Sequence, residues 1–325
     1  MNRRDFFIGA AIGALIANLP AVARAGDGLP VVAFLITHPP VDAPIVDMLR
    51  QGLLKYGYVD GQNVKLVVRT AHGQLDQVPK IAQELVDIPA DVIVIVNEIA
   101  LNAVRQATST TPIVMVGFID DPVQEGWIDS YRRSGTNVTG VFNVNANLVA
   151  KRLEILKESL PGLTRVAVFW DPVFGARQLE TMKRAGKVLG VEIESYEVAN
   201  GKDLPVAFRR AKRRKAGAVA LLWSPVFYVH RDELGKMALK YEMPTMADQD
   251  YLVDAGCLVF YGAMAEPAFE RAGYFVDRLL KGATPDQLPI EQLSDVKLVV
   301  NLKAAKTLGI TVPQSIHLRA DEVIE

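Results

Sequence analysis

The stretch Val92-Ile93-Val94-Ile95-Val96 consists only of β-branched apolar residues. Such a run predicts a strand that is covered on both faces, as in the middle of a parallel sheet. A second apolar run, VVAFLI at residues 31–36, has the same character. Stretches with helical spacing follow each run, so strands and helices alternate. The chain is therefore predicted to have an α/β fold with a parallel sheet.

The alternation continues on both sides of residues 92–96. The first half predicts strands at 31–36, 64–70, 92–96 and 112–116, with helices at 42–56, 76–86 and 98–108. The pattern then restarts, with helices at 148–160, 177–189, 204–215 and 231–241 and strands at 165–170, 191–198, 218–223 and 244–246. One more strand and helix follow at 258–261 and 267–281. Two doubly wound parallel sheets predict two lobes, with a ligand site beyond the carboxyl ends of their strands.

Composition and charge limit the possible functions. Half of the 325 residues are hydrophobic, enough for large cores, and the net charge is −1 at pH 7. This balance gives no basic surface for nucleic acid or anionic membranes. The only cysteine, Cys257, excludes internal disulfides and is interpreted as a buried strand residue.

The N-terminus has the pattern of an export signal. Arg3-Arg4 precedes an apolar stretch that ends near Leu19, and Ala23-Arg24-Ala25 is a small-x-small cleavage site. The apolar stretch is shorter than the roughly 20 residues that a membrane-spanning helix needs. Residues 1–25 are therefore predicted to be a signal peptide of the twin-arginine type, cleaved after Ala25, with the general export route as the alternative. No cysteine stands directly after the cleavage site to carry a lipid anchor, so the expected location is the periplasm.

Motifs of catalysis are not found in the sequence. It contains no G-x-S-x-G elbow, Walker loop, G-x-G-x-x-G or H-E-x-x-H. The four histidines (His38, His72, His230 and His317) do not have metal-ligand spacing. We expect no enzyme activity, no metal and no cofactor.

Several motifs, in this order and spacing, give the chain a family resemblance. They include Gly57-Tyr58-Val59-Asp60-Gly61-Gln62-Asn63, Asp121-Pro122-Val123, Asn137-Val138-Thr139-Gly140, Leu153-Glu154-Ile155-Leu156-Lys157, Leu279-Leu280-Lys281-Gly282-Ala283, Val299-Val300-Asn301-Leu302-Lys303 and Arg319-Ala320-Asp321-Glu322-Val323. With these motifs the chain resembles the ABC transporter substrate-binding proteins of the tryptophan/tyrosine type over essentially its whole length.

The resemblance implies a type I periplasmic-binding fold, in which three hinge crossovers join the lobes. We expect crossovers near Phe142-Asn143, near residues 247–250 and within residues 282–292. Lobe one would then comprise residues 26–141 and 249–283, and lobe two residues 142–248 and 284–325. A few hinge residues could let the lobes close around a ligand.

Candidate ligand-binding residues lie where strands are expected to end at the cleft. They are Thr37, Asn97, Glu98, Phe118, Asp121, Asn143, Asp171, Ser224, Asp248 and Tyr261. The alternative for the Asp, Asn, Ser and Thr residues is a helix cap, and the alternative for Tyr261 is a core aromatic residue. Four of the candidates are carboxylates, so the sequence also suggests an acidic cleft for a ligand with a cationic or hydrogen-bond-donating group.

The expected function is therefore capture of a small polar organic ligand, amino-acid-like or related, for an ABC uptake transporter. The expected partners are this ligand and the ABC permease subunits, and the protein is expected to be a monomer with neither nucleic-acid binding nor direct membrane insertion. The alternative is a periplasmic sensing subunit for a membrane-bound receptor. An enzyme lacks support in the motifs, and a sugar-type repressor would need a DNA-binding segment where the export signal stands.

Overall fold

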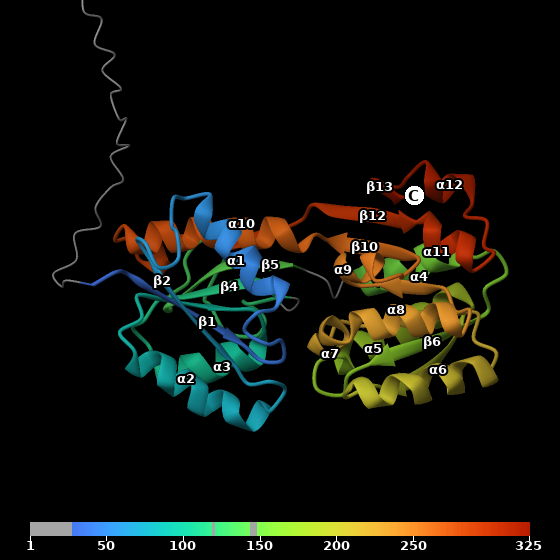
Figure 1. Cartoon of the computed structure of the whole chain (residues 1–325), viewed down its shortest axis with the longest axis horizontal. Helices are drawn as coiled ribbons and strands as arrows, with labels where there is room; N and C mark the ends of the chain where they lie inside the picture. The colour runs from blue at the N-terminus through green and yellow to red at the C-terminus, as the bar shows by residue number, and fades with distance from the viewer. Residues whose placement is uncertain (1–27, 119–120, 144–147) are drawn as a thin grey trace, which may run out of the picture.

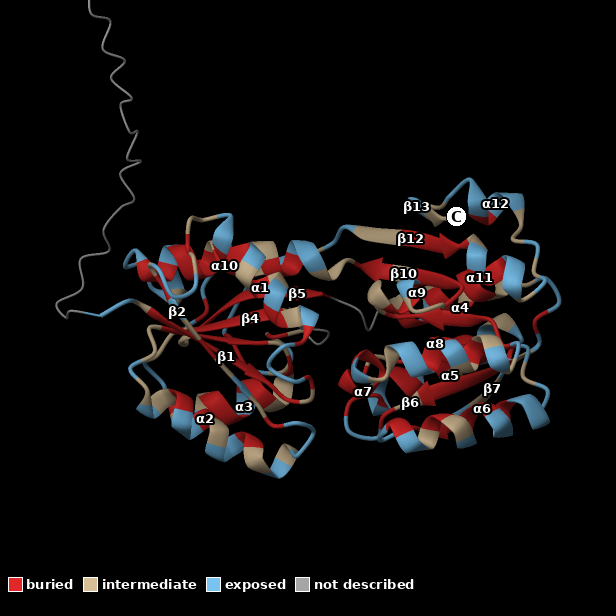
Figure 2. Ribbon diagram, viewed as in Figure 1, coloured by how far each residue is buried: buried red, intermediate tan, exposed pale blue. Residues whose placement is uncertain are grey.

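The computed structural model describes residues 28–118, 121–143 and 148–325, which form two α/β lobes side by side (Figure 1). The predicted signal peptide lies outside the described residues. The strands of both lobes are largely buried, and the exposed residues gather on the outer faces of the helices (Figure 2). In the described part of the chain, no helix is both long and apolar enough to cross a membrane.

Lobe one is built on a six-stranded sheet in the order β11-β5-β4-β3-β1-β2. The strands are β1 (Val31–Ile36), β2 (Lys65–Thr70), β3 (Val92–Ile95), β4 (Ile113–Phe118), β5 (Val138–Asn143) and β11 (Glu291–Leu293). Every pairing is parallel. All residues of β1 and β3 are buried, as their unbroken apolar sequences predict.

Helices cover both faces of the lobe-one sheet. On one face are α2 (Val78–Asp87) and α3 (Glu98–Ala107), preceded by the short η1 (Leu75–Gln77). On the other are α1 (Pro44–Leu54) and α10 (Ala265–Leu280), followed by η4 (Pro285–Gln287). The helices α1 and α10 approach each other closely at Gly52 and Gly273. A Cβ atom at Gly273 would lie 2.1 Å from the carbonyl oxygen of Gly52, so this close approach requires glycine.

Lobe two is built on a seven-stranded sheet in the order β13-β12-β10-β9-β8-β6-β7. The strands are β6 (Arg165–Trp170), β7 (Glu192–Glu197), β8 (Ala218–Leu221), β9 (Thr245–Ala247), β10 (Val259–Ala263), β12 (Val296–Asn301) and β13 (Glu322–Ile324). The pairing of β10 with β12 is antiparallel, whereas the others are parallel. This sheet is thus mostly, rather than wholly, parallel.

Two helical layers cover the lobe-two sheet. One core includes residues of α4 (Leu148–Ser159), α5 (Ala176–Leu189), α11 (Leu302–Thr307) and α12 (Gln314–His317). The other includes residues of α6 (Leu204–Arg213), α7 (Pro225–Val229), α8 (Arg231–Lys240) and α9 (Tyr251–Asp254), with η3 (Gly201–Asp203) before α6. The predicted fold class, two doubly wound α/β lobes, is confirmed.

The lobe boundaries differ from the predicted ones. The described chain changes sheet three times, between β5 and α4, between β10 and α10, and between β11 and β12. Residues 249–263 were assigned to lobe one, but β10 pairs with β9 and β12 and so lies in lobe two. Residues 284–293 were assigned to lobe two, but β11 pairs with β5 in lobe one. Residues 142–143, predicted in lobe two, belong to β5 and pair with strands of lobe one. These corrections have one reason: the sequence of a short strand does not show which sheet supplies its backbone partners.

Candidate ligand-binding site

A cavity lies between the two lobes, with about 770 Å³ of space that protein atoms do not fill, part of it open to solvent. A concave space between two lobes is a common place for a small-molecule ligand to bind. Its described lining residues are Thr37, Pro39, Ile45, Met48, Val96, Asn97, Val116, Gly117, Asn143, Ala265, Ala268 and Phe269 from lobe one, and Trp223, Pro225, Tyr228, Gln249, Tyr251 and Ala263 from lobe two.

The cavity lies at the carboxyl ends of the strands. In lobe one, Thr37 follows β1, Asn97 follows β3 and Asn143 ends β5. In lobe two, Trp223 lies just beyond β8, and Ala263 ends β10. Parallel strands leave this edge open because their connecting helices start there, so both sheets present polar and aromatic side chains to the same space.

The lining is mostly apolar and aromatic. Trp223, Tyr228, Tyr251 and Phe269 supply aromatic rings, and polar side chains come from Thr37, Asn97, Asn143 and Gln249. None of the described lining residues is an aspartate, glutamate, lysine, arginine or histidine. Because burial of an unpaired charge is costly, such a lining favours a ligand whose own net charge is zero.

Thr37 and Asn97 are tied to each other at the lobe-one side. The Asn97 Nδ2 donates to Thr37 Oγ1 at 2.8 Å, and Asn97 Oδ1 accepts from the Ala100 N–H at 3.0 Å as the N-cap of α3. Thr37 Oγ1 also lies 3.1 Å from Nδ1 of His38. These side chains therefore hold the ends of β1 and β3 together and present a fixed polar edge to the cavity.

Asn143 has an unfulfilled hydrogen-bonding capacity. The residue is 7% exposed, and its Oδ1 has no hydrogen-bond partner among the described residues. A buried amide oxygen without a donor is costly. Since Asn143 lines the cavity and ends β5 at the first crossover, its Oδ1 can accept a hydrogen bond from a ligand.

Asp171 and Ser224 stabilise the turns that follow β6 and β8 in lobe two, but they do not line the cavity. Ser224 Oγ donates to Asp171 Oδ2 at 2.7 Å. Ser224 Oγ also accepts the Val226 N–H, and Asp171 Oδ1 accepts the Val173 N–H. The helix-cap alternative therefore describes them well. The Asp171 charge raises the pKa of His38, in lobe one, but burial of the imidazole has the larger effect and lowers it overall.

Asp248 and Tyr261 lie around a buried arginine in lobe two. Nε of Arg152 donates to the Tyr261 carbonyl at 2.7 Å, and its Nη2 lies 3.4 Å from the Asp248 carbonyl. Both Arg152 and Asp248 are 2% exposed. Burial raises the pKa of Asp248 to about 6, although the Arg152 charge opposes the shift. The neighbours Gln249 and Ala263 line the cavity, so this cluster positions two segments of its wall.

The raised pKa of Asp248 predicts a pH-dependent stability. The folded state binds a proton more tightly than the unfolded chain, so the free energy of unfolding should fall as the pH rises from about 4 to about 6. Asp248→Asn should remove about 3 kcal/mol or less of this fall. Urea unfolding at several pH values measures the slope for both proteins. Equal slopes would show that Asp248 titrates normally.

Two further candidates, Asp121 and Glu98, are not among the described lining residues. Both carboxylate oxygens of Asp121 are engaged locally: Oδ1 accepts the Val123 N–H at 2.9 Å and Oδ2 the Tyr131 hydroxyl at 2.7 Å. Glu98 is the first residue of α3 and half-buried. Phe118 ends β4, and its side chain lies outside the described part. The acidic cleft suggested by the sequence is not formed by Glu98, Asp121, Asp171 or Asp248, since none lines the cavity.

Sequence reasoning missed most of the aromatic wall. Tyr228 and Tyr251 lie on α7 and α9, which have five and four residues and show no helical period in the sequence. Phe269 lies on α10, whose lobe-one position becomes clear only from its packing. The available signal was the end of β8, because Trp223-Ser224-Pro225 follows an apolar strand in the way that Thr37 follows β1.

Two mostly parallel α/β sheets with a cavity between them are the architecture of the periplasmic-binding-protein fold. The family model described as "ABC transporter substrate binding protein" matches residues 31–324, and the chain belongs to this family. The resemblance seen in the motifs is thereby confirmed. Members of the family are binding proteins and not enzymes.

One known protein and two solved structures are similar to this chain. The tyrosine-binding protein of Clostridioides difficile is 23% identical over 294 residues, covering 87% of this chain and 83% of that protein. An ABC domain from Streptococcus pneumoniae in complex with L-Trp is 23% identical, with a TM-score of 0.79 over 91% of this chain and 100% of that one. The ligand-free, open structure of the substrate-binding protein CD0873 from Clostridium difficile is 21% identical, with a TM-score of 0.62 over 91% and 99%.

Proposed function

We propose that this protein is the periplasmic solute-binding component of an ABC uptake transporter and that it captures one zwitterionic amino acid with an aromatic side chain. The observation that carries the proposal is the lining of the cavity: four aromatic rings and four neutral polar side chains, without a charged side chain among the described lining residues. Zwitterions have no net charge, and an aromatic side chain buries well against aromatic walls.

The polar atoms fit the amino-acid end of such a ligand. Asn143 Oδ1 is a buried acceptor at the cavity and can receive a hydrogen bond from the ligand ammonium group. The relatives support the same ligand class, since one is a tyrosine-binding protein and another was solved with L-Trp.

Isothermal titration calorimetry with single amino acids tests the ligand class. We expect L-tryptophan or L-tyrosine to bind with one site per chain, and L-lysine and L-glutamate to bind at least 30-fold more weakly because each would bury an uncompensated charge. D-Tryptophan serves as a control for stereochemical recognition of the amino-acid end. Equal affinity for charged and aromatic amino acids, or no binding of aromatic ones, would contradict the proposal.

The proposed location and partners follow from the same function. An uptake protein must deliver its ligand to ABC permease subunits, and lobe closure is the signal that such subunits can recognise. The Arg3-Arg4 pair and the Ala23-Arg24-Ala25 site support export to the periplasm by the twin-arginine route. N-terminal sequencing of periplasmic protein should find Gly26 first, and retention in the cytoplasm would contradict this location.

A further inference from the structure

A residue of the opposite lobe caps the N-terminus of helix α1. The helix starts at Pro44, and its N-cap residue, Ala43, has no side-chain oxygen with which to bind the first N–H groups. The Ile45 N–H instead donates to the hydroxyl of Tyr228 at 3.0 Å. Ile45 belongs to lobe one and Tyr228 to α7 in lobe two, so this hydrogen bond exists only when the lobes are together.

The side chain of Tyr228 is held rigidly within lobe two. It is 6% exposed and packs edge-on against Tyr251, with ring centres 4.8 Å apart. The Arg231 guanidinium lies 5.1 Å from the centre of the Tyr228 ring and donates to the Tyr228 carbonyl at 3.0 Å. The hydroxyl therefore has little freedom, and its hydrogen bond to α1 costs little side-chain entropy.

The same ring lines the cavity, beside Ile45 on the other wall. Burial raises the pKa of Tyr228, so the phenol keeps its proton near neutral pH. Its oxygen can accept the Ile45 N–H while its O–H remains able to donate into the cavity. The Tyr228 side chain thus contacts both the cavity and lobe one.

Other contacts between described residues of the two lobes differ in kind. The Ala265 N–H donates to Asp250 Oδ2 at 3.1 Å, but this bond lies at the crossover that follows β10. Arg177 and Glu125 form an ion pair at 2.6 Å, but the Arg177 side chain is 65% exposed, and such pairs contribute little. His38 and Phe174 pack edge-on with ring centres 5.8 Å apart, without a directional bond. The Tyr228 bond is partly buried and directional, and it lies away from the crossovers, which makes it the more selective for one lobe arrangement.

We infer that Tyr228 is a closing latch: its ring contacts the captured ligand, and its hydroxyl stabilises the closed lobes by capping α1. This role rests on the proposed function as a ligand-capturing protein. The latch shifts the open–closed equilibrium toward closure and slows the release of ligand, because opening must break the hydrogen bond.

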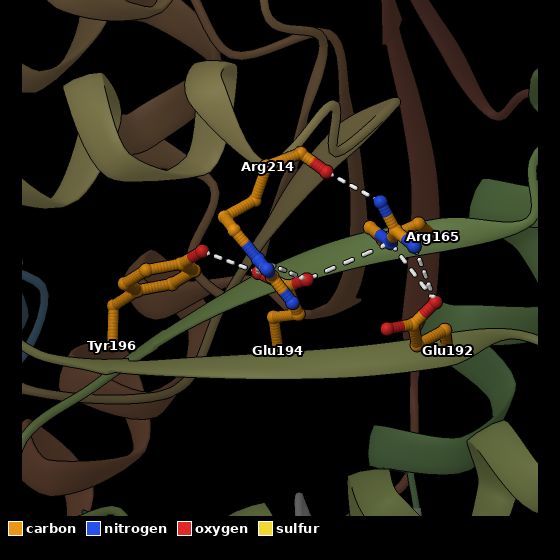
Figure 3. Close-up of polar contacts among 5 residues, drawn as sticks. All are labelled: Arg165, Glu192, Glu194, Tyr196 and Arg214. Atoms are coloured by element: carbon orange, nitrogen blue, oxygen red, sulfur yellow. Dashed lines mark hydrogen bonds and ion pairs between the residues drawn. The ribbon is translucent and has the colours of Figure 1, made fainter.

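Tyr228→Phe tests the latch, since it removes the hydroxyl and keeps the ring. The matched control is Tyr196→Phe: Tyr196 is also buried, and its hydroxyl donates to Glu194 at 2.6 Å entirely within lobe two, in a cluster with Arg165, Glu192 and Arg214 (Figure 3). Each variant thus loses one tyrosine hydroxyl and its hydrogen bond, but only the first loses a bond between lobes.

Spin-label distances report the lobe arrangement without any ligand. Labels at Lys80→Cys in α2 and Arg209→Cys in α6 lie on exposed faces of different lobes. The native Cys257 is fully buried, and burial raises the pKa of its thiol to about 12, so it does not compete for the label. We expect a short-distance population in the parent and in Tyr196→Phe, and a smaller one in Tyr228→Phe.

Calorimetry with L-tryptophan gives the second readout. Tyr228→Phe should weaken binding about 5- to 30-fold, mainly through faster dissociation, and Tyr196→Phe should leave it unchanged. The spin-label distances test the latch independently of the ligand. Identical distance distributions in the parent and in Tyr228→Phe, or a parent without the short-distance population, would overturn the latch. Failure of the parent to bind L-tryptophan would instead count against the proposed ligand class.

Discussion

Replacement of Arg152 by methionine should lower the free energy of unfolding by about 3–5 kcal/mol, the usual result of leaving a buried charge without its compensating charge. Methionine fills a similar volume, so the loss comes from polar groups rather than from a cavity. The Asp248 carboxylate would lose its nearby cation, and the Tyr261 carbonyl would lose its donor at 2.7 Å. Thermal and urea unfolding measure the effect, with an expected fall in Tm of about 10 °C.

Two controls make this result specific. Arg210→Met replaces an exposed arginine that lies over the Tyr196 ring, and it should change stability by about 0.5 kcal/mol or less. Arg152→Met combined with Asp248→Asn should recover part of the loss, because no buried carboxylate then lacks its cation. A stability of Arg152→Met within about 1 kcal/mol of the parent would show that the cluster contributes little.

Trp223→Ala should weaken the binding of L-tryptophan by about 30-fold or more, since buried aromatic residues at binding sites commonly contribute 2 kcal/mol or more. The indole lines the cavity and packs edge-on against Phe174, with ring centres 5.3 Å apart. Phe174 in turn contacts His38 of lobe one. Truncation would therefore remove a wall of the cavity and loosen one of the contacts that bring the lobes together.

Tyr274→Ala is the matched control for this prediction. Tyr274 is half-buried like Trp223, but it packs against Tyr56 and Phe275 in lobe one and does not line the cavity. It should lose stability without losing affinity. Calorimetry at a temperature where both variants remain folded separates the effects, and a Trp223→Ala affinity within threefold of the parent would remove Trp223 from the site.

The fold could be predicted from the sequence because its central strands have a strong pattern. The runs at β1 and β3 are apolar at every position, and the helices α1 and α2 between them have a clear period. The last strands were harder: β11 and β13 have three residues each, too few for a period. Length does not decide this alone, because β5 and β12 have six residues each and are also absent from the predicted strands.

The candidate site was predicted in part, for a similar reason. Thr37, Asn97 and Asn143 follow or end regular strands and do line the cavity. Asp171, Ser224 and Asp121 also lie at the ends of strands or turns, yet their side chains are bound to neighbouring backbone N–H groups. A sequence shows where a polar residue stands but not which partner its side chain selects. The aromatic wall depends on tertiary packing between segments far apart in the chain.

The interleaving of the two lobes also constrains the order in which the protein can fold. Lobe one receives α10 and β11 only after the chain has passed through β6 to β10 of lobe two, so its sheet lacks an edge strand and its α1 face lacks a cover until residue 293 is available. Those late segments bury Ala272, Phe275 and Val276 against the first lobe. A growing chain must therefore keep an apolar surface of lobe one exposed for most of its synthesis, when it is most open to aggregation and to chaperones.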